Sequence, residues 1–271
     1  MMSAPETTVR ASDISFRYGD QDFINNLYFH ARSGELTALV GPNGCGKSTL
    51  LKVLSRVLPM SRGSVQIIDS DVKTTPTKLV SKKLALLPQG PIAPEGLTVQ
   101  ELVAQGRFPH QSLLRQWSED DERAVKCALN QTSLMDFQDR PVSELSGGQR
   151  QRCWIAMVLA QETPVLFLDE PTTFLDLKVQ VDIMALLQKI AHCEQRTVVV
   201  AIHDLNVAAA YADRMVMMRE GRILFDGPVQ EVYMADNLDQ VFDLKVTIMT
   251  DPVSNRPVCV PITTRFSTAA E

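Results

Sequence analysis

A glycine-rich segment with a lysine and two hydroxyl residues, GPNGCGKST, occupies positions 41–49. Its spacing fits G-x-x-x-x-G-K-[ST], a loop that binds phosphate groups when it joins a strand to a helix. Gly41, Gly44 and Gly46 permit backbone torsions that larger residues resist, so the loop amides can converge on phosphate oxygens. A purely structural turn is the alternative, but it does not account for the lysine and serine that follow the glycines.

The side chains of this segment predict the rest of a nucleotide triphosphate site. Lys47 can reach the β- and γ-phosphates, and Ser48 can ligate Mg²⁺, which prefers oxygen ligands. We expect the whole segment to contact the nucleotide: Gly41, Pro42, Asn43, Gly44, Cys45, Gly46, Lys47, Ser48 and Thr49.

Two acidic residues follow an apolar run in PVLFLDEP, residues 164–171. The run predicts a buried strand that delivers Asp169 and Glu170 at its carboxyl end. Asp169 is expected in the magnesium shell, and Glu170, which points elsewhere, is expected to polarise the attacking water as a general base. An acidic strand end that merely faces solvent is the alternative, and the phosphate-binding loop argues against it.

The elements that position these residues alternate between strand and helix patterns. Strands are predicted at 9–18, 27–31, 36–40, 65–68 and 84–87, and a helix follows the glycine-rich loop near 50–57. Residues 97–162 read as mostly helical, with helix starts at TVQE (98–101) and SEDD (118–121). Buried strands return at 165–168 and 197–202, then a hairpin over 215–225 and a strand pair near 245–249 and 257–261. The pattern predicts an α/β fold with a helical insertion.

Composition excludes several classes of protein. The chain has 271 residues, 45% of them hydrophobic, and a net charge of -5, which argues against a polybasic surface for nucleic acid or membrane. Its five cysteines show no CxxC spacing, so neither structural zinc nor a disulfide framework is expected. The N-terminus lacks the apolar stretch of a signal peptide, and no apolar run is long enough to span a bilayer.

A second glycine motif, LSGGQ at residues 145–149, makes the chain resemble the ATP-binding subunits of ABC transporters. The resemblance covers nearly the whole chain. It implies a P-loop NTPase fold of the ABC type, with a RecA-like α/β core, an antiparallel β subdomain and a helical subdomain. We place the ATPase domain at 6–242, with the core and β subdomain at about 6–96 and 163–242, the helical subdomain at about 97–162, and a short strand pair and tail at 243–271.

The resemblance also assigns roles to single residues. Tyr18 in FRYG matches the aromatic that stacks on adenine, and Gln89 in LLPQG matches a glutamine that senses magnesium and the membrane subunit. His203 in VVVAIHD matches the switch histidine, which contacts the γ-phosphate and positions water and Glu170. Asp176 in FLD matches an aspartate that communicates across a dimer. Their plain alternatives are, in turn, a core tyrosine, a solvated glutamine, a structural histidine and a surface helix cap.

In this family the signature motif meets the γ-phosphate of ATP bound to a second copy of the chain. Ser146, Gly147, Gly148 and Gln149 are therefore expected at the nucleotide of the partner. The implied cycle closes a homodimer over two ATP molecules and reopens it after hydrolysis, as a ligand biases a two-state switch. The alternative is that the two glycines only make the loop before a buried helix flexible, in which case the motif would not imply a homodimer or a shared nucleotide site.

Three further stretches, 101–125, 148–163 and 169–177, are similar to ATPases of importers for ferric siderophores, haem and cobalamin, most of all for ferric siderophores, including catecholates. The resemblance implies two integral membrane permease subunits as partners, an indirect link to a substrate-binding protein, and a place on the cytoplasmic face of the cell (inner) membrane. Phe108 and Leu113 are expected either to contact the permease or to lie in the core, and the sequence favours neither alternative. The sequence names neither cargo nor permease.

Rival functions within the same fold are an exporter ATPase, a soluble ABC ATPase acting on ribosomes or DNA, and a non-catalytic scaffold. Ribosome-type members usually carry two cassettes, and DNA-repair members carry long coiled coils, whereas this chain shows one cassette and no sustained heptads. A scaffold would not need Lys47, Asp169, Glu170 and His203 together.

Overall fold

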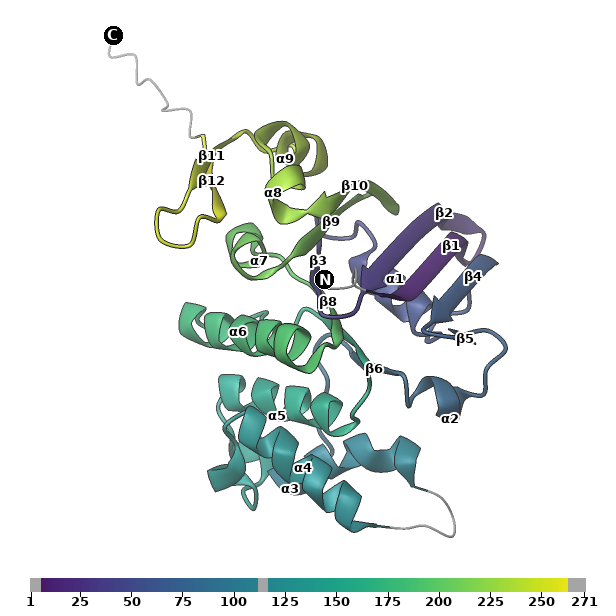
Figure 1. The fold of residues 1–271 in the computed structure, drawn as a ribbon, viewed down its shortest axis with the longest axis vertical. Coiled ribbons are helices and arrows are strands. Elements are labelled where there is room, and N and C mark those ends of the chain that lie inside the picture. Colours follow the sequence, from purple (N-terminus) through teal and green to yellow (C-terminus); the bar gives the residue numbers. More distant parts are fainter. Residues whose placement is uncertain (1–5, 112–116, 263–271) are drawn as a thin grey trace, which may run out of the picture.

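The computed structural model describes residues 6–111 and 117–262, and it contains two large sheets side by side, with helices from the middle of the chain below them and others above (Figure 1). The first sheet is antiparallel, in the order β2-β1-β4-β5, formed by Thr7–Tyr18 (β1), Gln21–Arg32 (β2), Arg62–Ile67 (β4) and Ser70–Asp71 (β5). β1 and β2 pair directly as a long hairpin, because Gly19 (φ 59°) provides the turn between them.

The second sheet is mainly parallel and has the order β10-β9-β3-β8-β7-β6. Its strands are Leu36–Val40 (β3), Leu84–Leu87 (β6), Val165–Asp169 (β7), Thr197–Ala201 (β8), Arg214–Arg219 (β9) and Arg222–Pro228 (β10). Only β10 runs antiparallel to its neighbour. The central strands β3, β7 and β8 are buried along their whole length, as expected for a parallel sheet covered on both faces.

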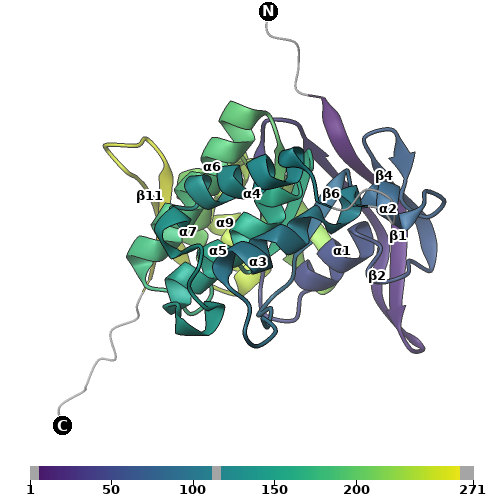
Figure 2. The ribbon, with the colours of Figure 1, turned by 90° about the horizontal axis from the view of Figure 1, so that it is seen from below.

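The helices fall into two groups around this sheet. Lys47–Leu54 (α1) and the short Thr77–Val80 (α2) accompany the antiparallel sheet, as Figure 2 shows from below. The other helices lie on the opposite side: Val99–Ala104 (α3), Gln105–His110 (η1), Glu119–Gln131 (α4), Met135–Phe137 (η2), Val142–Glu144 (η3), Gly147–Ala160 (α5), Leu177–Glu194 (α6), Leu205–Tyr211 (α7), Val229–Val232 (α8) and Ala235–Phe242 (α9). The chain then forms a small hairpin of Val246–Thr250 (β11) and Pro257–Pro261 (β12).

The alternation of side chains in the parallel sheet divides the apolar interior into two clusters. Val198 and Val200 of β8 face the cluster shared with α3–α7, whereas Val199 and Ala201 face the cluster shared with α1 and the antiparallel sheet. The strand ends that carry the polar residues therefore emerge from a rigid, doubly covered sheet.

The elements that the sequence predicted are present, with differences at their ends, but the long helix α6 and the shorter α2, α7 and β5 were not predicted. The capping boxes at Thr98–Glu101 and Ser118–Asp121 are confirmed. The strand expected at 27–31 is longer, beginning at Gln21. Between the two helix starts the chain also contains η1, a 3₁₀ turn with Pro109 inside it. Within the described residues, no helix combines the length and apolarity needed to cross a bilayer.

Candidate functional site

The loop at 41–46 joins β3 to α1, as its pattern predicts, and its glycines are required by the local geometry. Gly41 has a φ of 156°, and a Cβ atom on it would lie 2.2 Å from the Met218 carbonyl oxygen. Gly46 has a φ of 112° and precedes the first residue of α1. A side chain at either position would therefore distort the backbone of the loop.

Lys47 is buried at the centre of this loop, where its ammonium group contacts backbone carbonyls. Its Nζ donates to the Gly41 oxygen at 2.8 Å and to the Pro42 oxygen at 3.2 Å. Cys45 is also buried, and its Sγ lies 3.8 Å from the same Nζ. A phosphate chain laid along the loop would meet this fixed cation, and contacts between the ammonium group and neutral carbonyl oxygens would be replaced by contacts with anionic phosphate oxygens.

Ser48 and Asp169 come from different elements and meet beside the loop. Ser48 Oγ donates to Asp169 Oδ1 at 2.8 Å, while Asp169 Oδ2 is buried without a hydrogen-bond partner among the described residues. Burial raises the pKa of Asp169; the hydrogen bond from Ser48 opposes this, and the charge of Glu170 reinforces it. A hydroxyl and an under-satisfied buried carboxylate are oxygen donors of the kind that Mg²⁺ prefers, so the pair fits this ion.

The raised pKa predicts that Asp169→Asn stabilises the nucleotide-free protein. When the pKa of a carboxyl group in the folded protein lies above its ordinary value of 3.8, the protein loses stability as the pH rises from 3.8 through the folded-state pKa. An amide does not ionise, so the variant does not lose this stability. We expect Asp169→Asn to unfold at an equal or higher temperature than the wild type at pH 7.5 and to match it near pH 3.

The same variant is expected to lose the added stability that ATP with magnesium provides, about 2.7 kcal/mol at a hundredfold excess over Kd. Thermal unfolding with and without these ligands measures both effects. A variant that is less stable without ligand, yet still stabilised by ATP and magnesium, would contradict this reading.

Glu170 follows β7 and is held by side chains that come from the ends of two neighbouring strands. Its Oε1 lies 2.5 Å from His203 Nε2, beyond β8, and its Oε2 accepts from Gln89 Nε2 at 2.6 Å, beyond β6. Thr173 Oγ1 donates to the same Oε2 at 3.0 Å. Glu170 has a φ of 52°, a conformation that costs a non-glycine residue energy and is often retained at functional positions.

These contacts place Gln89 and His203 on the predicted general base, and Gln89 hydrogen-bonds to Glu170 rather than to the Ser48–Asp169 pair. Because β6, β7 and β8 are adjacent and parallel, their carboxyl ends open at one edge of the sheet. A water molecule at this edge could give a proton to Glu170, while His203 and Gln89 fix the orientation of the carboxylate.

A small pocket of about 110 Å³ lies over the loop and joins it to Glu170 and His203. Its lining is formed by Phe23, Asn43, Gly44, Gly46, Lys47, Ser48, Thr49, Glu170 and His203. Tyr18 is half-exposed nearby, with its hydroxyl 3.1 Å from Thr49 Oγ1 and its ring edge-on to Phe23. Sequence reasoning missed Phe23 and Thr173. Phe23 is the unpaired residue at a bulge of the β1–β2 hairpin, which the sequence does not reveal.

The LSGGQ segment forms the start of a helix, as expected. Ser146 caps α5 in a capping box with Gln149: the Gln149 amide donates to Ser146 Oγ, and the Ser146 amide donates to Gln149 Oε1 at 3.0 Å. A Cβ atom on Gly148 would lie 3.0 Å from Val179, whereas one on Gly147 would meet nothing closer than Leu175 at 3.9 Å. Packing within the chain thus explains Gly148 but leaves Gly147 unexplained.

Asp176 lies next to this helix start and caps the following helix. It accepts the Val179 amide of α6 at 3.0 Å, so the plain role foreseen for it, a helix cap, is present. The neighbouring Phe174 has a φ of 62° and a fully exposed ring. None of Ser146, Gly147, Gly148, Gln149 or Asp176 lines the pocket over the phosphate loop.

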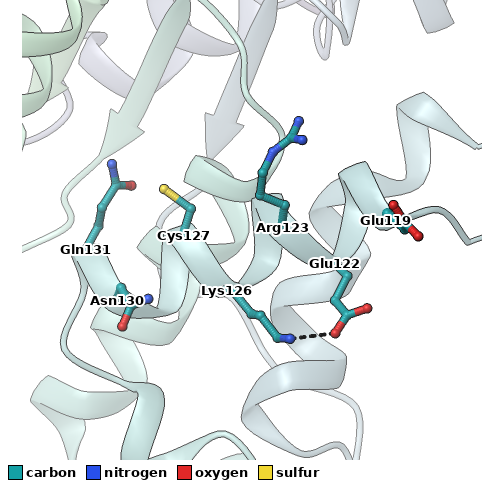
Figure 3. Close-up of a pocket in the computed structure, with 7 residues that line it drawn as sticks. All are labelled: Glu119, Glu122, Arg123, Lys126, Cys127, Asn130 and Gln131. Carbon is teal, nitrogen blue, oxygen red and sulfur yellow. Dashed lines mark hydrogen bonds and ion pairs between the residues drawn. The ribbon is translucent and has the colours of Figure 1, made fainter.

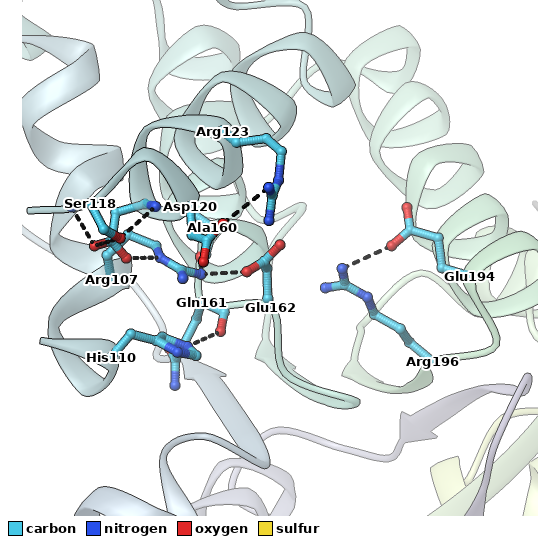
Figure 4. A network of polar contacts seen from close by, with 11 residues as sticks. Arg107, His110, Ser118, Asp120, Arg123, Ala160, Gln161, Glu162, Glu194 and Arg196 are labelled. Atoms are coloured by element: carbon cyan, nitrogen blue, oxygen red, sulfur yellow. Dashed lines mark hydrogen bonds and ion pairs between the residues drawn. The ribbon is translucent and has the colours of Figure 1, made fainter.

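Phe108 lies on a segment that a buried ion pair anchors. Arg107 Nε contacts Asp121 Oδ1 at 2.9 Å, and Arg107 Nη1 donates to the Ala160 oxygen and to Glu162, both at 2.7 Å (Figure 4). Burial raises the pKa of Asp121, but hydrogen bonds from Arg107 and Ser118 and the charge of Arg107 outweigh this and hold the pKa below its ordinary value. Phe108 itself is 78% exposed, so its alternative as a core residue was wrong; Leu113 lies outside the described residues.

Another hollow, about 680 Å³, runs along the outer face of α4 and lies apart from these residues. Figure 3 shows it lined by Glu119, Glu122, Arg123, Lys126, Cys127, Asn130 and Gln131. The Lys126–Glu122 pair within it is an ordinary contact one helical turn apart. It holds no group of the phosphate site and explains none of its chemistry.

The sheet order and the phosphate loop define an ATPase fold of the ABC type, and comparison with known proteins agrees. The family model described as ABC transporter matches residues 24–173, and the chain belongs to this family.

Among relatives, the probable siderophore transport system ATP-binding protein YusV of Bacillus subtilis strain 168 is 47% identical over 255 residues, 94% of this chain and 93% of that protein. A solved metal-chelate type ABC transporter in an inward-facing conformation superposes with a TM-score of 0.83 at 27% identity, covering 95% of this chain and 98% of that one. The dimeric bacterial ABC transporter cassette MJ0796 gives a TM-score of 0.72 at 27% identity, covering 82% and 98%.

Proposed function

We propose that this chain is the ATP-hydrolysing subunit of an importer that takes up a ferric siderophore across the cytoplasmic membrane. The observation that carries the catalytic part is the position of Glu170, which lies between His203 and Gln89 at the edge of the sheet where the Ser48–Asp169 pair also lies. The siderophore transport relative and the metal-chelate transporter support the cargo.

In the proposed mechanism the loop amides and Lys47 bind the phosphates, and Tyr18 stacks on the adenine. Ser48 and Asp169 would hold Mg²⁺, with Gln89 joining them when it leaves Glu170. The ion, when bound, supplies charge neutralisation across the phosphate oxygens. Glu170 accepts the proton of the attacking water, and His203 orients the carboxylate and contacts the γ-phosphate.

The second half of each site would come from another copy of the chain. The pocket over the loop is lined by the phosphate-binding residues and Glu170, and a Cβ atom on Gly147 at the start of α5 would meet no atom of the chain closer than 3.9 Å. We infer that Ser146, Gly147, Gly148 and Gln149 bind the γ-phosphate of the partner's ATP, and that Asp176 contacts the partner. The dimeric cassette MJ0796 supports such an arrangement.

Coupling would require two integral membrane permease subunits on the cytoplasmic face of the membrane, with a substrate-binding protein delivering the cargo. Phe108 is exposed on a segment that Arg107 ties to α4 and α5. A force on this apolar side chain would therefore reach α5, the helix that begins with the signature motif. We propose that Phe108 contacts the permease.

A deletion strain tests the cargo directly. We expect uptake of iron-55 bound to a siderophore to fall at least tenfold, to recover with the wild-type gene, and to stay low with Glu170→Gln, which removes the general base. Haem and cobalamin uptake, measured in parallel, are expected to be unchanged. Loss of haem or cobalamin uptake alone would replace the proposed cargo, and normal uptake of all three would contradict an importer of this group.

A further inference from the structure

The hairpin of β11 and β12 lies against α7, the helix that begins two residues after His203 (Figure 1). We propose that this hairpin, through Asn206 in the first turn of α7, positions His203 on Glu170. The proposal rests on the function proposed above for His203. Asn206 would be a positioning residue, since it acts through His203 and touches neither nucleotide nor water.

Asn206 joins α7 to the hairpin through both ends of its side-chain amide. Its Oδ1 accepts the Cys259 amide at 2.8 Å, and its Nδ2 donates to the Cys259 carbonyl at 3.2 Å. The Tyr233 hydroxyl donates to the same Oδ1 at 3.1 Å. Only this orientation of the amide satisfies all three partners, so the side chain is fixed as a backbone segment would be in a sheet.

These partners are buried, which makes the contacts strong and costly to lose. Tyr233 is 2% exposed and Cys259 7% exposed. Burial, reinforced by Cys259, raises the pKa of Tyr233, so its hydroxyl remains a donor across the physiological range. A buried donor or acceptor left without its partner costs more than the hydrogen bond contributes, so the geometry around Asn206 is sharply defined.

The hairpin holds the far end of α7 as well. Arg256 Nη1, from the turn between β11 and β12, donates to the Ala212 carbonyl at 2.9 Å. Ala212 follows the last residue of α7 and is completely buried. The hairpin therefore contacts α7 near its first turn and just beyond its last.

α7 depends on such support because it is short. It has seven residues, and isolated helices of this length are not stable in water. The parallel sheet fixes the chain up to Ile202, whose amide donates to the Leu39 carbonyl. His203 lies between that last fixed point and α7, with a partly exposed ring in contact with Glu170. Loosening α7 would leave one side of this histidine unsupported.

The test compares Asn206→Ala with Asn237→Ala in the purified full-length chain. Asn237 also bonds a backbone carbonyl, that of Val232 at 2.9 Å, but it lies on α9. We expect Asn206→Ala to lower kcat for ATP hydrolysis on the order of tenfold with an unchanged KM, because a small displacement of a catalytic group costs rate rather than substrate affinity. Asn237→Ala is expected to keep wild-type kcat. Equal losses of kcat in the two variants would overturn the proposal.

A double-mutant cycle with His203→Ala separates positioning from general loosening. If Asn206 acts through His203, Asn206→Ala lowers kcat no further in the His203→Ala background; an undiminished tenfold effect there would overturn the proposal. Wild-type activity of His203→Ala would instead refute the role proposed for His203. Should Asn206→Ala fail to fold, Tyr233→Phe replaces it, since this change removes one hydroxyl without opening a cavity. For the proposal to stand, Tyr233→Phe must lower kcat with an unchanged KM and must lower kcat no further in the His203→Ala background.

Discussion

Glu170→Gln is expected to lower ATP hydrolysis at least a hundredfold while the protein still binds ATP and forms a persistent dimer with it. A positioned general base contributes roughly 10²–10⁴ in rate, and an amide cannot accept the proton of the attacking water. The phosphate loop, Lys47 and the Ser48–Asp169 pair are untouched by the change. Without hydrolysis, nothing removes the γ-phosphate contact that holds the two copies together.

The geometry around Glu170 explains why this substitution should not disturb the fold. The oxygen of a glutamine can accept from Gln89 and Thr173, as Oε2 does now, and its amide can donate to His203 Nε2 in the other tautomer. Light scattering with ATP and magnesium measures the dimer, and phosphate release measures the rate. A variant that stays monomeric with ATP bound, or that hydrolyses at the wild-type rate, would refute the proposed cycle.

The parts of the site that are continuous in sequence could be predicted, because their geometry is local. The loop at 41–49 takes positive φ angles at Gly41 and Gly46, which glycine permits locally, and Ser146 with Gln149 closes its own capping box. The same is true of the capped helix starts at Thr98 and Ser118. Local spacing was sufficient wherever a motif carried both partners of an interaction.

Contacts between segments that are distant in the sequence could not be predicted from local spacing. Gln89 and Glu170 are 81 residues apart, and Asn206 and Cys259 are 53 apart, so only the order of the strands and the path of the last hairpin bring them together. Gly148 has a second constraint for the same reason: a Cβ atom on it would lie close to Val179 of α6, a contact within the chain that the motif alone did not reveal. Physical reading of a motif is thus weakest where a second element supplies the constraint.

The distinction between the two glycines makes Gly147 the cleaner probe of the shared site. We expect Gly147→Asp to fold normally, with a stability within about 0.5 kcal/mol of the wild type, because the position has open space and a carboxylate is favourable at a helix start. Its ATPase activity should nonetheless fall at least a hundredfold, since the carboxylate would repel the partner's γ-phosphate. Gly148→Ala should lose stability as well, through contact with Val179.

Mixing Gly147→Asp with the separately inactive Lys47→Ala should restore activity. In a mixed dimer, one site combines both defects, whereas the other combines an intact phosphate loop with an intact signature helix. Random association gives about half mixed dimers, and therefore up to about a quarter of the wild-type activity. If two differently tagged variants co-purify with ATP and yet recover no activity, each site is not shared between subunits. If Gly147→Asp alone is fully active, the start of α5 does not bind phosphate.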